Sequence, residues 1–226
     1  MDLEKRCKQC LDRQSKLRQV LTQPAKFSEG RAAFLVQHAS LHSCKIEADQ
    51  EWSFEDSILN DLPESSMRLI LKGQEHSIAW CLWHIARIED VTMNMLLAGD
   101  AQVFERDSWE KRLSTTISHT GNLMTAGEIA ELSSKIDIEA LRMYRAEVGR
   151  KTRQIVRRLH AGDMKIKVHP GRIEKVVRAG VVVEGAKEIV DYWSRRDTAG
   201  LLLMPATRHN LVHLNEALRI KNKIYR

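Results

Sequence analysis

Two histidines near the C-terminus have the spacing of a pair of metal ligands. They stand four residues apart in the pentapeptide His209-Asn-Leu-Val-His213. Each residue of an α-helix turns by about 100°, so the second side chain would lie only roughly 40° around the helix from the first. Both imidazoles could then reach one ion, but two ligands make a poor site. The best candidate for a third is His84, within the apolar segment Trp80-Cys-Leu-Trp-His-Ile-Ala.

Three imidazoles without a fourth protein ligand describe an open metal site. Such a site keeps one coordination position for water or a substrate atom, which is the catalytic rather than the structural arrangement. Imidazole suits zinc, nickel, iron and copper. We therefore expect a divalent metal ion, with zinc as the default and nickel or ferrous iron as alternatives. No nearby carboxylate is an obvious general base: Glu216 follows His213 by three residues, and Glu89 follows His84 by five.

A second histidine pair, His38-Ala-Ser-Leu-His42, has the same spacing and is a rival. A generic pair of this kind is more often a surface or core feature than a ligand pair, and spacing alone does not rank the two. The pair at His209 and His213 is more clearly expected to point into the core. It shares one helix face with four apolar residues, namely Leu202, Ala206, Ala217 and Ile220. An unsatisfied buried imidazole would cost about 1–3 kcal/mol, and one shared ion would satisfy all three histidines.

The apolar periodicity predicts an all-α fold. Helical segments are expected at 3–21, 31–46, 75–98, 126–133, 137–160, 184–195 and 197–222. The four longest segments after residue 30 predict a four-helix bundle with an extra N-terminal helix and inserted short helices. We treat 1–226 as a single domain, with 1–30 as an N-terminal helical extension and 163–195 as an insertion before the last helix.

Several connecting segments are less regular. His169-Pro170-Gly171 is expected to be a loop, and Val181-Val-Val183 could form a short strand. Pro205 falls inside the last predicted helix, which therefore either kinks there or begins there.

Composition restricts the class of protein. The chain has 226 residues, of which 43% are hydrophobic and 29% charged, as in an ordinary soluble protein. No apolar run approaches the roughly 20 residues needed to span a membrane, and the start lacks a signal-peptide pattern, so a cytoplasmic protein is expected. The net charge of +6 is modest, and its basic stretches are not interleaved with aromatic residues, so nucleic-acid binding is weakly supported. The four cysteines are expected to be reduced and mostly buried: Cys7, Cys10, Cys44 and Cys81.

The two histidine motifs resemble those of a known family. The segment from Glu75 to Asp90 is similar to the second helix of the DinB-like superfamily, in which a histidine stands in a His-Ile/Leu-Ala context. The segment from Arg208 to Ala217 resembles the last helix of that family, with its H-x-x-x-H. The resemblance implies a four-helix bundle whose metal ligands are His84, His209 and His213. Typical members are shorter than this chain.

The resemblance also implies a set of functions. Family members with assigned chemistry are transferases and isomerases that use low-molecular-weight thiols such as bacillithiol or mycothiol, and homodimers are common. A metal-dependent thiol transferase or isomerase is therefore one expectation, in which Arg150, Arg153 and Arg157 could hold an anionic thiol. The alternative is a non-catalytic metal-binding or interaction protein with the same fold.

Overall fold

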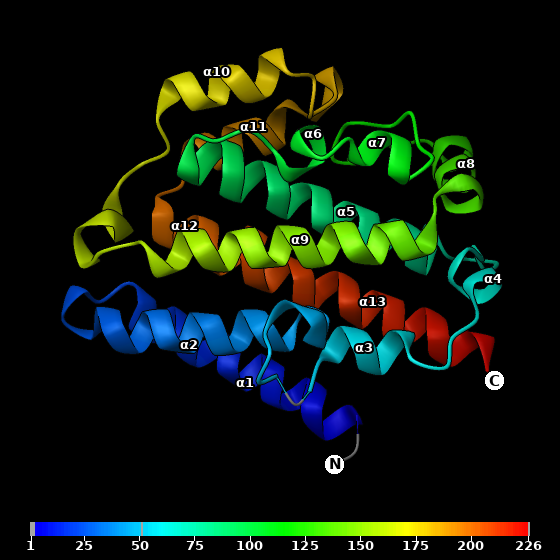
Figure 1. Ribbon diagram of the computed structural model, residues 1–226, viewed down its shortest axis with the longest axis horizontal. Coiled ribbons are helices and arrows are strands. Elements are labelled where there is room, and N and C mark those ends of the chain that lie inside the picture. Colours follow the sequence, from blue (N-terminus) through cyan, green and yellow to red (C-terminus); the bar gives the residue numbers. More distant parts are fainter. Residues whose placement is uncertain (1–2, 51, 226) are drawn as a thin grey trace.

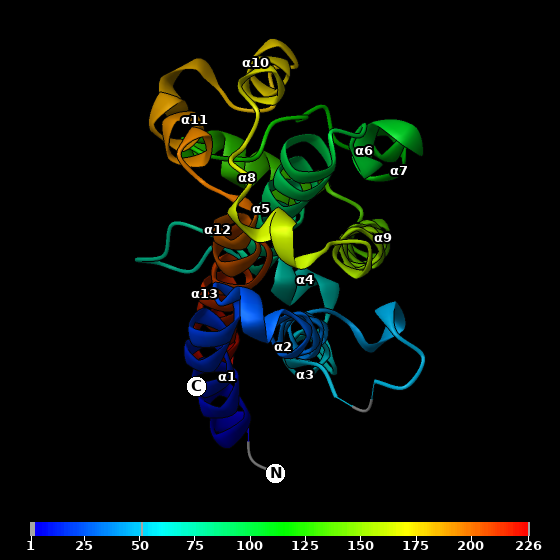
Figure 2. The ribbon, with the colours of Figure 1, turned by 90° about the vertical axis from the view of Figure 1, so that its left-hand side faces the viewer.

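Four long helices run side by side as a bundle (Figure 1). They are α2 (Phe27–Ser40), α5 (Ile78–Asp90), α9 (Ile138–Arg157) and α13 (His209–Ile224) in this computed structural model, which describes residues 3–50 and 52–225. Helix α9 packs against both α2 and α5, and α5 packs against α13. Figure 2 views the bundle along its helices and shows α1 (Leu3–Leu21) lying outside it, beside α2. The predicted all-α bundle with an extra N-terminal helix is confirmed.

Short helices connect the members of the bundle. They are α3 (Phe54–Leu59), α4 (Glu64–Met67), α6 (Val103–Arg106), α7 (Trp109–Arg112), α8 (Ala126–Lys135), α10 (Pro170–Arg178) and α11 (Lys187–Ser194). Single 3₁₀ turns lie at Pro24–Lys26, Cys44–Ile46, Ala161–Lys165 and Glu184–Ala186. Within the described ranges, no helix is both long and apolar enough to cross a membrane.

Helix α5, which carries His84, has well-defined ends. The side chain of Ser77 accepts a hydrogen bond from the backbone N–H of Trp80 and so caps its first turn. Beyond Asp90 the helix continues as a π-helical segment, Val91–Ala98. It ends at Gly99, whose φ of 77° is the left-handed conformation that glycine adopts without a steric penalty. The end at residue 98 that was predicted for this helical segment is confirmed.

The last helix does not break at Pro205. Helix α12 (Thr198–Leu203) leads into a π-helical turn, Met204–Arg208, and this turn leads directly into α13. Proline has no backbone N–H, and its ring clashes with the preceding turn of an α-helix, so a wider turn accommodates it. The side chain of Asn210 donates to the carbonyl of Pro205 at 3.1 Å. The helix therefore passes through the proline, and His209 follows the widened turn immediately.

Two of the predictions for connecting segments are wrong. Residues 181–183 form no strand in the part of the chain that the structure describes; the carbonyl of Val181 instead accepts a hydrogen bond from Thr120 N at 2.8 Å. The expected loop at His169-Pro170-Gly171 begins helix α10, with Pro170 in its first turn. Proline suits that position because the first helical N–H has no partner within the helix.

Buried charges join the helices at the centre of the bundle. Asp90 accepts hydrogen bonds from the hydroxyl of Tyr144 at 2.6 Å and from the backbone N–H groups that begin α6. The guanidinium of Arg87 donates to the same tyrosine at 2.9 Å. Because each buried charge has partners of suitable geometry, the network fixes α5 against α9.

Candidate metal centre

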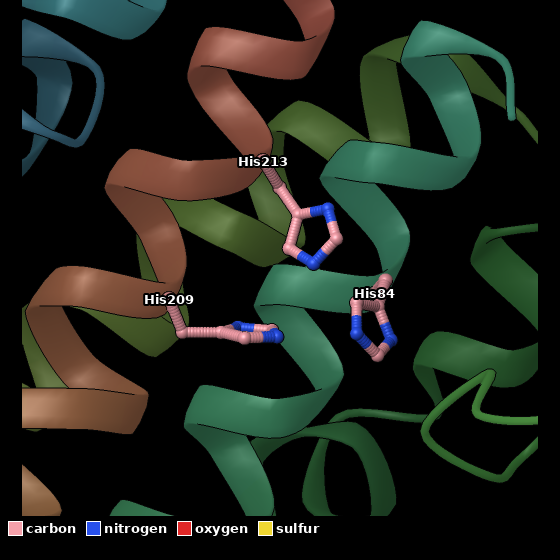
Figure 3. Close-up of side chains that lie close together, drawn as sticks. All are labelled: His84, His209 and His213. Atoms are coloured by element: carbon pink, nitrogen blue, oxygen red, sulfur yellow. The ribbon is translucent and has the colours of Figure 1, made fainter.

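Three imidazoles from two helices meet between α5 and α13 (Figure 3). His84 lies on α5, and His209 and His213 lie one turn apart on α13. The ring centroids are 4.9 Å apart for His84 and His209, 4.9 Å for His84 and His213, and 4.7 Å for His209 and His213. One ring nitrogen from each lies within 4.8 Å of the others. The structure thus brings together all three histidines that the sequence singles out.

Hydrogen bonds fix the orientation of two of these rings. Nδ1 of His84 lies 2.6 Å from the backbone carbonyl of Thr120, and Nδ1 of His213 lies 2.9 Å from a carboxylate oxygen of Glu216. Both partners can only accept, so each Nδ1 carries a hydrogen, and Nε2 is the atom that presents a lone pair when the ring is neutral. Histidine ligands of metals characteristically donate their other ring N–H to a carbonyl or carboxylate in this way.

The third ring has an unsatisfied nitrogen. Nδ1 of His209 is buried and has no hydrogen-bond partner among the described residues. A buried polar atom without a partner is unfavourable by about 1–3 kcal/mol. Three imidazole nitrogens in this arrangement match the donor set of an open site for zinc or a similar ion.

Aromatic packing and a glycine hold His84 from the other sides. The ring of Trp80 stacks on His84 with centroids 4.6 Å apart, and His76 stacks on the far face of Trp80 at 3.6 Å. Gly121 has a φ of 83°, and a Cβ built on it would lie 3.5 Å from Nδ1 of His84. The loop that contains Gly121 therefore approaches the ring closely and presents the carbonyl of Thr120 to it.

Burial keeps two of the imidazoles neutral. It lowers the pKa of His84 to about 3, and the neighbouring His213 acts in the same direction. Burial also holds the pKa of His209 well below its ordinary range, with His84 and His213 adding to the effect. A neutral imidazole is the form that binds a metal, so these rings need not lose a proton at neutral pH.

The metal-free protein should lose stability on acidification. Between pH 6.5 and 3, the unfolded chain binds a proton at His84 that the folded chain does not, so the free energy of unfolding rises with pH. From pH 7.5 to 5.5, His84 and His209 would each remove about 1.4 kcal/mol. Urea unfolding at several pH values measures this. In the variant His84→Gln, the free energy of unfolding should depend less steeply on pH. The control His160→Gln, at a side chain that is 88% exposed, should keep the pH dependence of the wild type. A flat wild-type profile would contradict the expectation.

Glu216 links the site to a fourth histidine. Its carboxylate accepts hydrogen bonds from Nδ1 of His213 at 2.9 Å and from Nδ1 of His76 at 2.8 Å. Burial by itself would raise the pKa of Glu216, but the hydrogen bonds from His213 and His76 hold it well below its usual range. In the sequence, Glu216 is not an obvious general base. Its i, i+3 position relative to His213 is the signal that could have identified it as the group that orients this ring.

Replacing Glu216 with glutamine should weaken metal binding without removing a ligand. The amide keeps a hydrogen-bonding oxygen but loses the charge that increases the basicity of His213, and such changes lower metal affinity about 10- to 100-fold. Competition against a chromophoric chelator measures this affinity. Glu174→Gln, on the exposed face of α10, is the matched control and should leave the affinity unchanged.

A cavity of about 310 Å³ opens beside His209. Its walls come mainly from α11 and from the turn around Pro205, and they include Ile88, Ile189, Tyr192, Trp193 and Met204. Its described lining also includes the carboxylate of Glu188 and the amide of Asn122 but no lysine or arginine. A molecule with an apolar part could therefore lie next to the metal site.

The rival pair does not join this site. His38 and His42 lie on and just after α2, and they contact Glu89 rather than the other histidines. The arginines expected to hold an anionic thiol are also engaged elsewhere. Arg153 and Arg157 pair with Glu47, and Arg150 pairs with Glu147.

The cysteines are free thiols and differ in burial. Cys10 and Cys81 are buried, and Cys7 and Cys44 are partly exposed. Cys81 stands near His213 and Glu216, but burial raises the pKa of its thiol well above the ordinary value. A buried, protonated thiol is a poor nucleophile and a poor ligand.

Comparison with known families agrees with this geometry. The sequence model of a family described as the DinB superfamily matches residues 48–188. The match contains His84 but ends before α12, so it does not include His209 and His213. The position of these two histidines beside His84 comes from the structure. Comparison with curated proteins gave no match. Because the family match covers more than half of the chain and the helices form the expected bundle, the chain belongs to the DinB superfamily.

Proposed function

We propose that this protein binds a divalent metal ion, zinc in the first place, through His84, His209 and His213. The observation that carries the proposal is the convergence of one nitrogen from each ring within 4.8 Å. The orientation of His84 by Thr120 and of His213 by Glu216 supports it, because both hydrogen bonds leave a lone pair free. Nickel and ferrous iron are alternatives, since imidazole suits each of them.

We further propose that the protein is an enzyme that transfers or isomerises a substrate with the help of a low-molecular-weight thiol. A bound ion would lower the pKa of the thiol or polarise a carbonyl or leaving group. In a transfer, the sulfur would form a bond to an electrophilic carbon, the leaving group would depart with the bonding electrons, and the thiol proton would pass to solvent.

The cavity beside His209 favours one placement of the substrates. Its walls are largely apolar, and the carboxylate of Glu188 is the only charged group among its described lining residues. A carboxylate repels an anionic thiol and accepts a hydrogen bond from a neutral or cationic group. The cavity therefore suits the apolar electrophile, with His209 at the side where the sulfur would be held.

Thiol consumption tests this activity. Metal-loaded protein is mixed with bacillithiol, mycothiol or glutathione and with an apolar electrophile such as monochlorobimane, and product formation is followed by fluorescence. The proposal predicts turnover with at least one thiol, its loss in His213→Ala, and its retention in His160→Ala. Stoichiometric metal binding without turnover would instead support a non-catalytic metal-binding or interaction protein.

A further inference from the structure

A second cluster of ligand-type side chains is enclosed between α2 and α5. His38, His42 and Glu89 are each 0% exposed. Nε2 of His38 lies 2.8 Å from one carboxylate oxygen of Glu89, and Nε2 of His42 lies 3.0 Å from the other. The two rings stack with their centroids 4.0 Å apart. Two imidazoles thus face the two oxygens of one carboxylate.

The hydrogen bonds of His42 leave a nitrogen facing the carboxylate without a proper partner. Nδ1 of His42 lies 3.0 Å from the backbone carbonyl of His38, which can only accept, so Nδ1 carries a hydrogen. Nε2 is fully buried and makes no hydrogen bond of acceptable geometry to any described residue, although Glu89 is 3.0 Å away. In the neutral ring this nitrogen and the carboxylate oxygen both present lone pairs, and a cation between them would remove the repulsion.

His38 also has a ring nitrogen that the protein does not satisfy. Its Nδ1 is buried and lacks a hydrogen-bond partner in the described part of the chain. Phe34 stacks on the ring at 5.4 Å, so its surroundings are apolar there. This nitrogen is not the one that faces Glu89, since His38 contacts the carboxylate through Nε2. An unpaired buried nitrogen of this kind is rare in native interiors, because it is unfavourable by about 1–3 kcal/mol.

The neighbouring residues hold this cluster in a fixed geometry. Asn210 donates to one oxygen of Glu89 at 2.9 Å, and Arg145 donates to the amide oxygen of Asn210 at 2.8 Å. On α9, a Cβ at Gly149 would lie 2.7 Å from Cδ2 of His42, so only glycine leaves room for the ring. The carboxylate is oriented from one side, and the imidazole has its space on the other.

We propose that His38, His42 and Glu89 form a second, enclosed site for a divalent metal ion that fastens α2 to α5. Two imidazoles and a carboxylate are ligands of zinc, iron and nickel, and the three ligand atoms lie within 4.8 Å of one another. Bonds of about 2.0–2.1 Å at a tetrahedral ion require an N···O separation of roughly 3.3 Å. The cluster would open by a few tenths of an ångström to accept the ion.

Burial distinguishes this site from the three-histidine site. The side chain of His213 is 15% exposed, whereas His38, His42 and Glu89 are fully buried. An ion at the enclosed site must enter as the chain folds or opens, and it should leave slowly. Its exchange with a chelator would therefore be slower than that of the ion at the three-histidine site.

Metal counting on the folded protein tests the proposal. Protein produced with added zinc is passed through a desalting column, and its metal content is measured by elemental analysis before and during incubation with EDTA. We expect about two ions per chain, one lost quickly and one lost slowly. The variant His213→Ala should keep about one ion, the slow one. The variant Glu89→Gln should lose the slow ion and keep the fast one.

The outcomes separate this proposal from the proposed function. One ion in the wild type and none in His213→Ala would overturn the enclosed site, leave the three-histidine site in place, and indicate that the cluster holds a proton. One slow ion that His213→Ala retains would support the enclosed site and contradict the other. If Glu89→Gln does not fold, the wild-type and His213→Ala counts still decide the question.

Discussion

Replacing His213 with alanine is expected to weaken binding of the rapidly exchanging metal ion by more than about 100-fold. Removing a group that merely orients a histidine ligand lowers affinity about 10- to 100-fold, and removing a ligand should exceed that. His213 is the most suitable position because its side chain is 15% exposed, whereas His84 is only 3% exposed, so the substitution at 213 disturbs the core less. Glu216 keeps its hydrogen bond to His76 in the variant.

Equilibrium competition with a chromophoric chelator at constant pH measures this loss. The control is His160→Ala, since His160 is 88% exposed on its side chain and pairs only weakly with Asp163 at 3.6 Å. Unchanged affinity in His213→Ala would show that the three imidazoles do not share an ion.

The second large effect is expected at Arg145, whose replacement by methionine should reduce the free energy of unfolding by about 3–5 kcal/mol. Its guanidinium donates to Glu55 at 2.5 Å, to Asn210 at 2.8 Å and to the carbonyl of Leu41 at 2.8 Å. Arg145 and Glu55 are 1% and 0% exposed. Burial already raises the pKa of Glu55, and the positive charge of Arg145 opposes that rise. Without the arginine, Glu55 would be left as an unpaired buried charge or would take up a proton.

Arg142 provides a matched control on the same helix. It pairs with Asp56 at 3.9 Å, and its side chain is 27% exposed, so Arg142→Met should change stability by no more than about 1 kcal/mol. Chemical unfolding of both variants, followed by circular dichroism, measures the difference. Equal stabilities would mean that the buried pair at Arg145 contributes no more than a surface pair.

The long helices of the bundle could be predicted because their signals are local. The apolar spacing around His84, the glycine at 99 and the capping aspartate at 137 act within one or two turns of the chain. The π-helical turn at Met204–Arg208 could not be predicted in this way. It depends on how the proline at 205 is accommodated between α12 and α13, and a sequence pattern admits a kink, a new start or a widened turn.

The site shows the same division between local and tertiary information. The spacing of His209 and His213 predicts a pair of metal ligands. His38 and His42 have the same spacing, so spacing alone does not show which pair binds a metal. What separates the pairs is the partner that each meets on α5. Five residues on a helix correspond to roughly 140° of rotation, so His84 and Glu89 point to different neighbours of the same helix. The hydrogen bond from His84 to the carbonyl of Thr120 is likewise invisible in sequence, because it depends on the path of a loop.

One metal ion is expected to lie between His84, His209 and His213. Crystals of zinc-loaded protein, measured at wavelengths on both sides of the zinc absorption edge, test this most directly. We predict an anomalous difference peak about 2.0–2.1 Å from one nitrogen of each of the three rings. The account would be contradicted by zinc-loaded crystals whose peaks all lie elsewhere, for example between Cys81 and Glu216, with none between the three imidazoles.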